Sequence, residues 1–342
     1  MSGPAIAVVT VAHDSAADLE RTLPALCDQL RPGDELVVVD SGSSDGSAEV
    51  ARRLAPEATV VAPGANVGFA RGCRVGVEAS SAPLVLLLNP DCTPAPGCVD
   101  ALRAAAAERP DWAAWQALVT LPDGERVNTA GNLVHYLGFG WAGRLDEPVA
   151  SVPNHPHDAG FLSGAAMAIR RAAWEETGGF DERYFIYGED LDLSLRLRLA
   201  GHGIGVVPAA RVAHEYEFAK GGYKWFYLER NRWWTVLAVY PAPLLALLAP
   251  ALLAFEVVLL LASWRGGWLP AKLRAQRAVV RDLPRILARR RAVQRTRRVS
   301  AARFADGLVA SLDSPHLAMG RAVPGAEPLQ ALYWRLVRAA LR

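Results

Sequence analysis

The sequence predicts an α/β protein with a mostly parallel central sheet flanked by helices, followed by a C-terminal helical region that associates with a membrane. Within residues 6–88, short and nearly continuous apolar runs alternate with segments of helical periodicity. Strands of this kind belong to parallel sheets that helices cover on both faces. The chain has 342 residues, 51% of them hydrophobic and 21% charged, so it can bury a large core.

Strands and helices are expected to alternate in the first part of the chain. The expected strands are 6–11, 35–39, 59–61 and 84–88, and the expected helices between them are 18–30, 47–54 and 68–79. In the first helix, Leu19, Leu23, Leu26 and Leu30 recur at the spacing of one helical face. Ligands of such sheets bind at the carboxyl ends of the strands.

Residues 122–158 are expected to form a long irregular connection, because they are rich in glycine, proline, asparagine and aromatic residues. Connections of this length are usually lids or binding loops, and the alternative is a poorly ordered insertion. Regular structure is expected to return with a strand at 160–169. A helix at 190–200, closed by Gly201, and a short strand at 205–208 follow.

The C-terminal region combines an apolar and a basic segment. Residues 233–255 contain no charge, a stretch longer than the ~18 residues typical of a membrane span. Residues 265–303 then carry 13 Lys and Arg and one acidic residue, and such segments tend to stay cytoplasmic. A single span would separate this segment from the N-terminal part, so we expect a re-entrant hairpin or in-plane helices broken near Pro250, on anionic lipid. The alternative is a soluble helical bundle that packs on the first part or joins two copies.

Charge and cysteine usage agree with a cytoplasmic protein that meets an anionic partner. The formal net charge is only +2, but residues 265–342 hold 17 Lys and Arg against four acidic residues. Without a Cys-x-x-Cys pair, Cys27, Cys73, Cys92 and Cys98 are expected to be thiols in a reducing compartment rather than zinc ligands. No basic and apolar leader begins the chain, so no signal peptide is expected.

Candidate binding residues follow the strands. Asp40 ends the strand 35–39 and precedes a turn-rich loop, Ser41 to Gly46. It can accept hydrogen bonds from a uracil or thymine ring or from a ribose. The alternative is a tight turn before a helix, with Asp45 or Ser47 as the cap.

A glycine-containing stretch, Asn66 to Gly72, opens the helix expected at 68–79. Glycines allow close backbone approach, and the amides and Arg71 can face a phosphate. Helix capping with a surface arginine explains the same residues. After the strand 84–88, Pro90 leaves Asp91 at the sheet edge, where Mg²⁺ or Mn²⁺ can bridge it to a diphosphate; a turn aspartate is the alternative.

Acidic residues also crowd together at a helix start. Glu189 and Asp190 are adjacent, with Asp192 close by. Capping explains one acid there, whereas crowded acids more often mark a site, and a carboxylate in it can take a proton from an attacking hydroxyl. His214, which follows the last strand, is by itself more often structural than a ligand.

These motifs, in this order, resemble family 2 glycosyltransferases with the A-type nucleotide-diphospho-sugar fold, and most closely their rhamnosyltransferase-like bacterial branch. The matching stretches are Val38–Gly46, Asn66–Gly68, Leu87–Asp91, Ser163–Ala165, Gly178–Glu182, Gly188–Asp192 with Arg196, His214, and Tyr227–Asn231. They cover about residues 5–235. There are two departures: Asn89 replaces the first aspartate of the usual metal motif, and Val11–Ser15 lacks the Tyr-Asn of many relatives.

The resemblance implies a role for each candidate. Asp190 would be the catalytic base, and Asp91 and His214 would hold Mg²⁺ or Mn²⁺. The nucleotide sugar would be bound by Asp40, Ser41, Asn66, Gly68, Arg71, Asn89 and Asp91. The acceptor or the diphosphate would be bound by Ser163, Gly164, Glu189, Arg230 and Asn231. The chain would divide into a catalytic domain (1–232), membrane-associating helices (233–303) and a helical tail (304–342).

The implied function is an inverting, metal-dependent transfer from a nucleotide-diphospho-sugar, with dTDP-rhamnose as the expected donor. The expected acceptor is a polyprenyl-diphosphate-linked glycan of cell-envelope polysaccharide, at the cytoplasmic face of a bacterial membrane. One alternative is a UDP-sugar transferase with a soluble or protein acceptor. Another is an inactive membrane-bound scaffold, which is disfavoured because Asp91 and Asp190 are both present.

Other classes fit less well. No Gly-x-Gly-x-x-Gly follows the first strand, which disfavours a nicotinamide enzyme. The arginine-rich stretch 285–298 resembles a nucleic-acid patch, but it lies near the apolar run and suits a membrane better, so no nucleic-acid partner is expected. The C-terminal helices could also form a homo-oligomer.

Overall fold

The computed structural model describes residues 3–215, 222–312 and 326–342, and the chain divides into two compact units. The first unit consists of Met1–Asn132, Ala142–Leu197 and His202–Phe218, and the second of Leu133–Trp141, Arg198–Gly201 and Ala219–Arg342. The segments expected at 233–303 and 304–342 both belong to the second unit.

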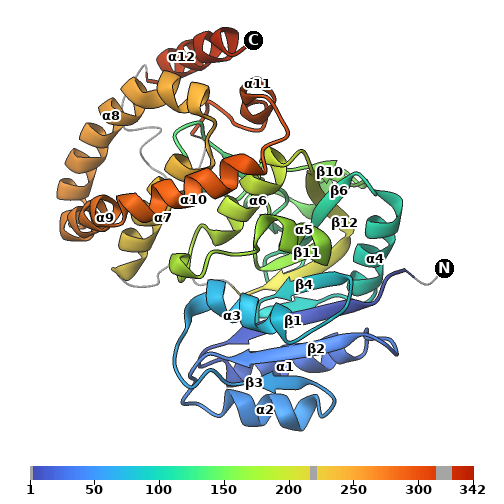
Figure 1. The fold of residues 1–342 in the computed structure, drawn as a ribbon. Coiled ribbons are helices and arrows are strands. Elements are labelled where there is room, and N and C mark those ends of the chain that lie inside the picture. The colour runs from blue at the N-terminus through green and yellow to red at the C-terminus, as the bar shows by residue number, and fades with distance from the viewer. Residues whose placement is uncertain (1–2, 216–221, 313–325) are drawn as a thin grey trace. The chain divides into compact units, whose positions relative to one another are not determined.

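The first unit holds one large sheet and its covering helices (Figure 1). Its strands are β1 (Ile6–Ala12), β2 (Glu35–Asp40), β3 (Thr59–Val61), β4 (Leu84–Leu88), β5 (Cys92–Pro94), β6 (Trp112–Thr120), β7 (Val127–Thr129), β10 (His157–Asp158), β11 (Ala166–Arg170) and β12 (Gly203–His214). Its helices are α1 (Ala16–Cys27), α2 (Ser47–Leu54), α3 (Gly68–Glu78), α4 (Cys98–Glu108), α5 (Arg171–Thr177) and α6 (Glu189–Leu199), whose last two residues belong to the second unit.

The main strand order of the sheet is β10-β12-β6-β11-β4-β1-β2-β3. The strands β3, β2, β1 and β4 run parallel, and β6 is parallel to β12. Between these two groups, β11 runs antiparallel to both of its neighbours, β4 and β6. The predicted α/β class with a mostly parallel sheet is therefore confirmed.

The sheet is buried because its strands are apolar on both faces. All five residues of β4 are buried. Leucines of α1, together with α2 and α4, form one core with alternate residues of the central strands, and each such leucine contributes about 1.5–3 kcal/mol on burial. On the other face α3 lies close to β1, since a Cβ on Gly76 would be 2.2 Å from Val9.

Two predicted strands differ from the observed ones. The strand expected at 160–169 begins only at Ala166, because the amides before it bond to side chains: Ser163 donates to Gln116 Oε1 at 2.7 Å and Gly164 to Asp190 Oδ2 at 3.0 Å. The strand expected at 205–208 extends over the whole of β12, with an irregularity after Val207. The connection at 122–158 contains only short strands and a 3-10 turn, as expected for an irregular segment.

The second unit is mainly helical and includes a hairpin from the middle of the chain. Its elements are β8 (Leu133–Val134), β9 (Gly140–Trp141), α7 (Tyr223–Val239), α8 (Ala242–Arg265), α9 (Leu269–Arg281), α10 (Leu283–Arg295), α11 (Ala301–Ala305) and α12 (Ala326–Ala340). The hairpin belongs here because the ring of Tyr136 stacks on Trp334 of α12 at 5.1 Å, and His135 bonds to the Ala310 carbonyl.

The break expected near Pro250 is absent. α8 is one continuous helix with Pro250 inside it, and the chain turns instead at Tyr240 and Pro241. A proline removes one helical hydrogen bond, but Leu244, Leu248 and Leu252 form a buried stripe on one side of α8. This packing holds the helix together across the proline.

Candidate active site

The carboxyl ends of β1 and β2 carry two loops that are bonded to each other. Asp14, in the first loop, accepts a hydrogen bond from the Ser44 amide at 2.7 Å. Asp45, in the second, accepts one from the Ala16 amide at 2.8 Å. Asp45 thus fastens the loops together, and its Oδ1 also accepts the amide of Ser47, the first residue of α2, at 3.1 Å and the Ser47 hydroxyl at 2.6 Å, so the alternative of Asp45 as a cap fits as well.

Three of the expected nucleotide-binding residues meet at this edge. Asp40 ends β2, and one of its oxygens accepts a backbone amide of the following loop at 3.0 Å. The buried hydroxyl of Ser41 accepts the Val67 amide at 3.0 Å and lies 3.4 Å from Asn66 Oδ1. Gly42 makes this approach possible: its φ is +72°, and a Cβ there would lie 2.7 Å from the backbone at Asn66.

Asn66 joins this edge to a residue that the sequence did not assign to the site. Its Oδ1 accepts the Gly68 amide at 2.9 Å, and its Nδ2 lies 2.9 Å from Nε2 of His13. The only signal for His13 in the sequence was its place directly after the first strand, where the chain departs from the Tyr-Asn of many relatives.

The start of α3 lies against the segment that leads to Asp190. Gly68 has φ +76°, and a Cβ there would lie 2.5 Å from the ring of Phe185. The Phe185 carbonyl accepts the Ala70 amide at 3.1 Å. Phe185 and Tyr187 both have positive φ, at 64° and 68°, a strained conformation that concentrates at functional sites.

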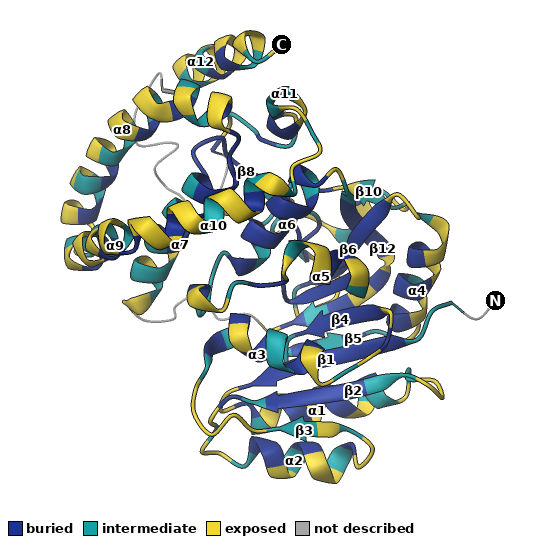
Figure 2. Cartoon of the chain, viewed as in Figure 1, coloured by how far each residue is buried: buried dark blue, intermediate teal, exposed yellow. Residues whose placement is uncertain are grey.

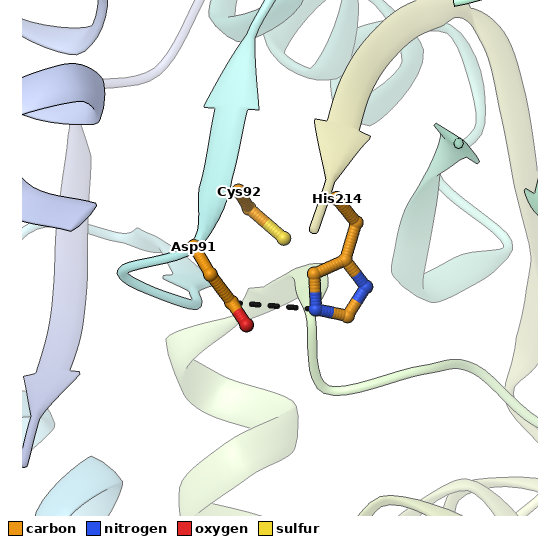
Figure 3. A group of neighbouring side chains, drawn as sticks. All are labelled: Asp91, Cys92 and His214. Atoms are coloured by element: carbon orange, nitrogen blue, oxygen red, sulfur yellow. Dashed lines mark ion pairs between the residues drawn. The ribbon is translucent and has the colours of Figure 1, made fainter. Parts of the chain in front are cut away.

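Asp91, Cys92 and His214 form a cluster at the ends of β4 and β12. Figure 3 shows their side chains turned toward one another, with His214 Nε2 3.3 Å from Asp91 Oδ1. The ligand atoms of all three lie within 4.8 Å of one another. The cause is the antiparallel pairing of β5 with β12, which sets His214 opposite Cys92. The structure thus brings the two expected metal ligands together.

Cys92 is an addition to the predicted cluster. Burial raises the pKa of its thiol well above the ordinary value, so the sulfur is protonated and is a poor ligand for a hard cation. Asn89, at the end of β4, has a buried Oδ1 without a hydrogen-bond partner among the described residues. A buried oxygen of this kind is costly unless it accepts a hydrogen bond from a ligand or from a water molecule bound with the ligand.

Asp190 is held by two backbone amides at the start of α6. Its Oδ2 accepts the Gly164 amide at 3.0 Å and its Oδ1 accepts the Leu191 amide at 2.7 Å. Burial raises the pKa of Asp190, and these bonds oppose the rise. Burial raises the pKa of Glu189 further, assisted by the neighbouring Asp190 charge. Glu189 is 5% exposed, and its Oε2 has no hydrogen-bond partner in the described part of the chain.

The third acid, Asp192, has a structural role. It is fully buried and accepts hydrogen bonds from the Tyr184 hydroxyl at 2.9 Å and Arg196 Nε at 2.8 Å. Arg196 also donates to the carbonyls of Thr177 and Gly179 at 2.6 Å each. This buried ion pair fastens the loop between α5 and α6, which is why three acids stand so close together in the sequence.

A comparison with known families decides the class of this protein. Residues 4–235 match the family described as "Glycosyltransferase like family 2". The chain belongs to this family. It is a glycosyltransferase, as its motifs indicated.

Two relatives place this glycosyltransferase near the rhamnosyltransferases. N-acetylglucosaminyl-diphospho-decaprenol L-rhamnosyltransferase of Mycobacterium tuberculosis (strain ATCC 25618 / H37Rv) is 31% identical over 238 residues, which are 63% of this chain and 77% of the relative. Rhamnosyltransferase WbbL of Escherichia coli (strain K12) is 38% identical over 73 residues, 21% of this chain and 26% of the relative. The rhamnosyltransferase-like character expected from the motifs is confirmed.

Two solved structures share the fold. GalNAc-T7, solved with UDP, GalNAc and Mn²⁺, superposes with a TM-score of 0.58 at 16% identity and covers 70% of this chain and 49% of its own. The mannosyltransferase PcManGT of Pyrobaculum calidifontis, solved with GDP-Man and Mn²⁺, has a TM-score of 0.51 at 18% identity and covers 99% of this chain and 86% of its own. The predicted A-type glycosyltransferase fold is confirmed.

For the remaining expected site residues, the structure gives only contacts with other groups of the protein. Arg71 is exposed on α3, with its Nε 3.8 Å from Glu182. The Ser163 hydroxyl accepts the Ala165 amide at 3.3 Å, in the turn before β11. Arg230 and Asn231 lie on α7 in the second unit, bonded to each other at 2.9 Å. Their acceptor role stays a prediction.

Proposed function

We propose that this glycosyltransferase transfers rhamnose from dTDP-rhamnose to a hydroxyl of a lipid-linked glycan, with inversion at the anomeric carbon. The rhamnosyltransferase relatives support the donor sugar. The name of the mycobacterial relative adds an acceptor of the expected kind, an N-acetylglucosaminyl-diphospho-decaprenol. The reaction would contribute to cell-envelope polysaccharide assembly at the cytoplasmic face of a bacterial membrane.

One observation carries this proposal: the adjacent residues Gly164 and Ala165 bond to the proposed base, Asp190, and to Asn89, which lies two residues before the proposed metal ligand Asp91. The Asn89 amide donates to the Ala165 carbonyl at 2.9 Å, and the Gly164 amide donates to Asp190 at 3.0 Å. A diphosphate bound near Asp91 and a hydroxyl bound near Asp190 would therefore lie along the same sheet edge.

Asp190 is the proposed base. Its carboxylate accepts the proton of the acceptor hydroxyl while that oxygen bonds to the anomeric carbon and the nucleotide diphosphate leaves from the opposite face. No covalent sugar–enzyme intermediate forms, so the configuration inverts. The raised pKa of Asp190 makes the carboxylate a stronger base, and the amides of Gly164 and Leu191 favour its ionised form.

Asp91 and His214 are the residues that would hold a divalent ion. A carboxylate is a ligand that Mg²⁺ and Mn²⁺ both accept, and the imidazole favours the transition ion Mn²⁺. The unsatisfied Oδ1 of Asn89, two residues before Asp91 in the chain, would suit a hydrogen bond from a ligand or from a metal-bound water. When bound, the ion offsets the negative charge that develops on the leaving diphosphate.

The second unit is proposed to dock on an anionic membrane surface. Among the described residues, α8 is the one helix long and apolar enough to cross a membrane, with a mean hydropathy of 2.6. One side of it is exposed (Figure 2): Leu253, Val257 and Trp264 are 68%, 59% and 65% exposed. An apolar face of this kind fits the acyl boundary of a bilayer.

Another side of α8 is bound to protein. Glu256, in the second half of the helix, accepts hydrogen bonds from Lys272 at 2.7 Å, from Gln276 at 3.0 Å and from Arg232. A carboxylate fixed in this way keeps one face of α8 inside the helical unit. This supports a helix that lies in the membrane plane rather than one that crosses it alone.

The helices α9 and α10 add exposed arginines next to exposed apolar residues. The arginines are Arg274, Arg277, Arg281, Arg285, Arg291 and Arg295, and the apolar residues are Leu273, Val280, Leu283 and Leu287. Each basic residue at an anionic bilayer contributes about 1 kcal/mol. This charge supports anionic lipid as the partner.

A donor screen with the full-length protein tests the proposal. dTDP-rhamnose, UDP-glucose, UDP-galactose and UDP-GlcNAc would each be incubated with Mg²⁺ or Mn²⁺ and a polyprenyl-diphosphate-linked GlcNAc, and nucleotide release would be measured. We expect metal-dependent release from dTDP-rhamnose that needs the acceptor and is lost in Asp91→Ala. Release from a UDP-sugar and not from dTDP-rhamnose would show that the proposed donor is wrong. No release from any of the four donors would contradict the proposal.

A further inference from the structure

Cys92 is the member of the cluster at the ends of β4 and β12 that the proposed reaction does not use. It is fully buried, and Figure 3 shows its side chain turned toward Asp91 and His214. The ligand atoms of the three residues lie within 4.8 Å of one another. A thiol, an imidazole and a carboxylate are the side-chain groups with which proteins bind zinc.

The distances within this cluster suit a tetrahedral ion. Zinc forms bonds of about 2.0–2.3 Å to oxygen, nitrogen and sulfur, so two ligand atoms of one tetrahedral ion lie about 3.4–3.6 Å apart. Asp91 Oδ1 and His214 Nε2 are 3.3 Å apart. The sulfur is at most 4.8 Å from the other two ligand atoms, so it must approach by at most about 1.2 Å. Since Cys92 pairs directly with His214, both side chains project on the same face of the sheet.

The sulfur favours a different ion from the one that the reaction is proposed to use. Mg²⁺ and Mn²⁺ prefer oxygen ligands, and a thiol offers them little. Thiolate ligands instead select zinc and softer ions. When zinc binds, the S–H bond breaks, the proton goes to solvent and an S–Zn bond forms, while no atom changes its oxidation state. Asp91 and His214 can therefore hold Mn²⁺ without the sulfur or Zn²⁺ with it.

We propose that Asp91, Cys92 and His214 form an inhibitory site for zinc, which competes with the ion needed for transfer. This inference rests on the proposed function, in which Asp91 and His214 hold that ion, and it adds a role for Cys92. Zinc held by three protein ligands keeps one open position. An octahedral ion held by two protein ligands keeps several, enough for two oxygens of a diphosphate. Zinc bound in this way should therefore prevent transfer.

Two other cysteines provide matched controls. Cys73, on α3, is buried like Cys92, so Cys73→Ala removes a buried sulfur away from the cluster. Cys27, at the end of α1, is the one cysteine that is only partly buried, so Cys27→Ala removes the thiol most open to adventitious metal. Within the described ranges, Asp91, Cys92 and His214 are the one group of three such side chains close enough to share an ion.

Metal binding to the full-length protein tests the inference. Dissociation constants of Zn²⁺, Cd²⁺ and Mn²⁺ would be measured by calorimetry for the wild type, Cys92→Ala, Cys73→Ala and Cys27→Ala. Cd²⁺ also reports on its ligands, because a cadmium–thiolate bond absorbs ultraviolet light and bonds to oxygen or nitrogen do not add this absorption. Cadmium NMR distinguishes in the same way a site with one sulfur from a site with none.

We expect Cys92→Ala to bind Zn²⁺ and Cd²⁺ about tenfold or more weakly than the wild type, whereas its affinity for Mn²⁺ should change by less than about twofold. The cadmium–thiolate absorption should be lost in Cys92→Ala and kept in both controls. Zinc should also inhibit Mn²⁺-dependent transfer by the wild type. Relative to its own rate without zinc, Cys92→Ala should need about tenfold or more zinc for half-inhibition.

Contrary results are distinct from one another. Equal zinc affinity of the wild type and Cys92→Ala, or loss of the cadmium–thiolate absorption in a control instead, would overturn this inference and leave the proposed function intact. Should Cys92→Ala fold poorly, cadmium NMR of Cys27→Ala decides: a sulfur ligand supports the inference, and oxygen and nitrogen ligands alone overturn it. Failure of the wild type to transfer a sugar with Mn²⁺ or Mg²⁺ would overturn the proposed function, whereas zinc binding is measured without any donor.

Discussion

The backbone amide of Gly164 donates a hydrogen bond to Oδ2 of Asp190 over 3.0 Å. This bond joins the turn before β11 to the start of α6, and it is one reason why that turn does not continue the strand. A carboxylate that accepts hydrogen bonds from backbone amides keeps one orientation, and these bonds favour its ionised form, which is the form that can act as a base. The geometry prepares Asp190 to receive a proton without moving.

Gly68→Ala should impair the site more than an equivalent change nearby. Gly68 and Gly64 both have positive φ, at +76° and +83°, but only a Cβ on Gly68 meets other atoms, at 2.5 Å from the ring of Phe185. Both variants bear the cost of a left-handed alanine, about 1 kcal/mol. Gly68→Ala should also displace Phe185, and with it the approach to Asp190, so transfer should fall at least tenfold.

Gly64→Ala is the matched control, because nothing lies within 4 Å of its added Cβ. Unfolding by urea and initial rates of transfer would be measured for both variants. Equal loss of transfer in the two would mean that the contact between Gly68 and Phe185 has no functional weight.

Lys272→Met should strongly destabilise the second unit. Lys272 is fully buried and contacts Glu229 at 3.2 Å and Glu256 at 2.7 Å. Burial raises the pKa of Glu256, but the charges of Arg232 and Lys272 lower it below the ordinary value. Without Lys272, two buried carboxylates would share one cation, and breaking such a pair costs about 3–5 kcal/mol. Arg274→Met, at an exposed position of the same helix, is the control; similar urea midpoints would refute the prediction.

His135 should make the protein less stable in mild acid. Burial lowers its pKa to about 4, although its bond to the Ala310 carbonyl opposes this. The unfolded chain binds a proton near pH 6.5, so the unfolded state gains protons first as the pH falls. Stability should decrease by about 2 kcal/mol between pH 7 and pH 5. In His135→Gln, which does not titrate, urea unfolding should depend less on pH; parallel pH profiles would show that His135 is not responsible.

Exchanging Leu253 and Val257 for glutamate should release the protein from membranes. Both side chains are exposed on α8, so the change should spare the fold while placing charge on the apolar face. In vesicle flotation, we expect the wild type to bind phosphatidylglycerol vesicles and not phosphatidylcholine vesicles, most strongly at low salt. Ala104→Glu, on α4 of the first unit, should float like the wild type. Flotation of the double variant would argue against this face.

Much of the fold could be predicted because its signals are local. The strands β1, β2 and β4 are continuous apolar runs, and α1 shows helical spacing of its leucines. Asp40 and Asp91 could be proposed as site residues because they lie at or just after the ends of such runs, and their roles stay predictions. The second unit was harder, since Pro250 suggested a break that lateral packing of α8 prevents.

Contacts between distant segments could not be read from local patterns. His214 meets Asp91 and Cys92 only through the register of β5 with β12, and the three-residue β5 has no periodicity of its own. His13 reaches the site through Asn66, fifty-three positions away. The hairpin at 133–141 joins the helical unit through Tyr136 and Trp334, which no spacing rule connects.

The most direct test of the account compares Asp190→Asn with Glu189→Gln in rhamnosyl transfer and in dTDP binding. The two acids are adjacent, but only Asp190 is proposed to accept the proton of the acceptor hydroxyl. Glu189 is buried, and its raised pKa favours the neutral carboxyl group, which glutamine imitates. We predict that Asp190→Asn loses transfer by a factor of about 10² or more and binds dTDP like the wild type, whereas Glu189→Gln keeps most of its transfer. Near-normal transfer by Asp190→Asn would contradict the assignment of the base and, with it, the proposed mechanism.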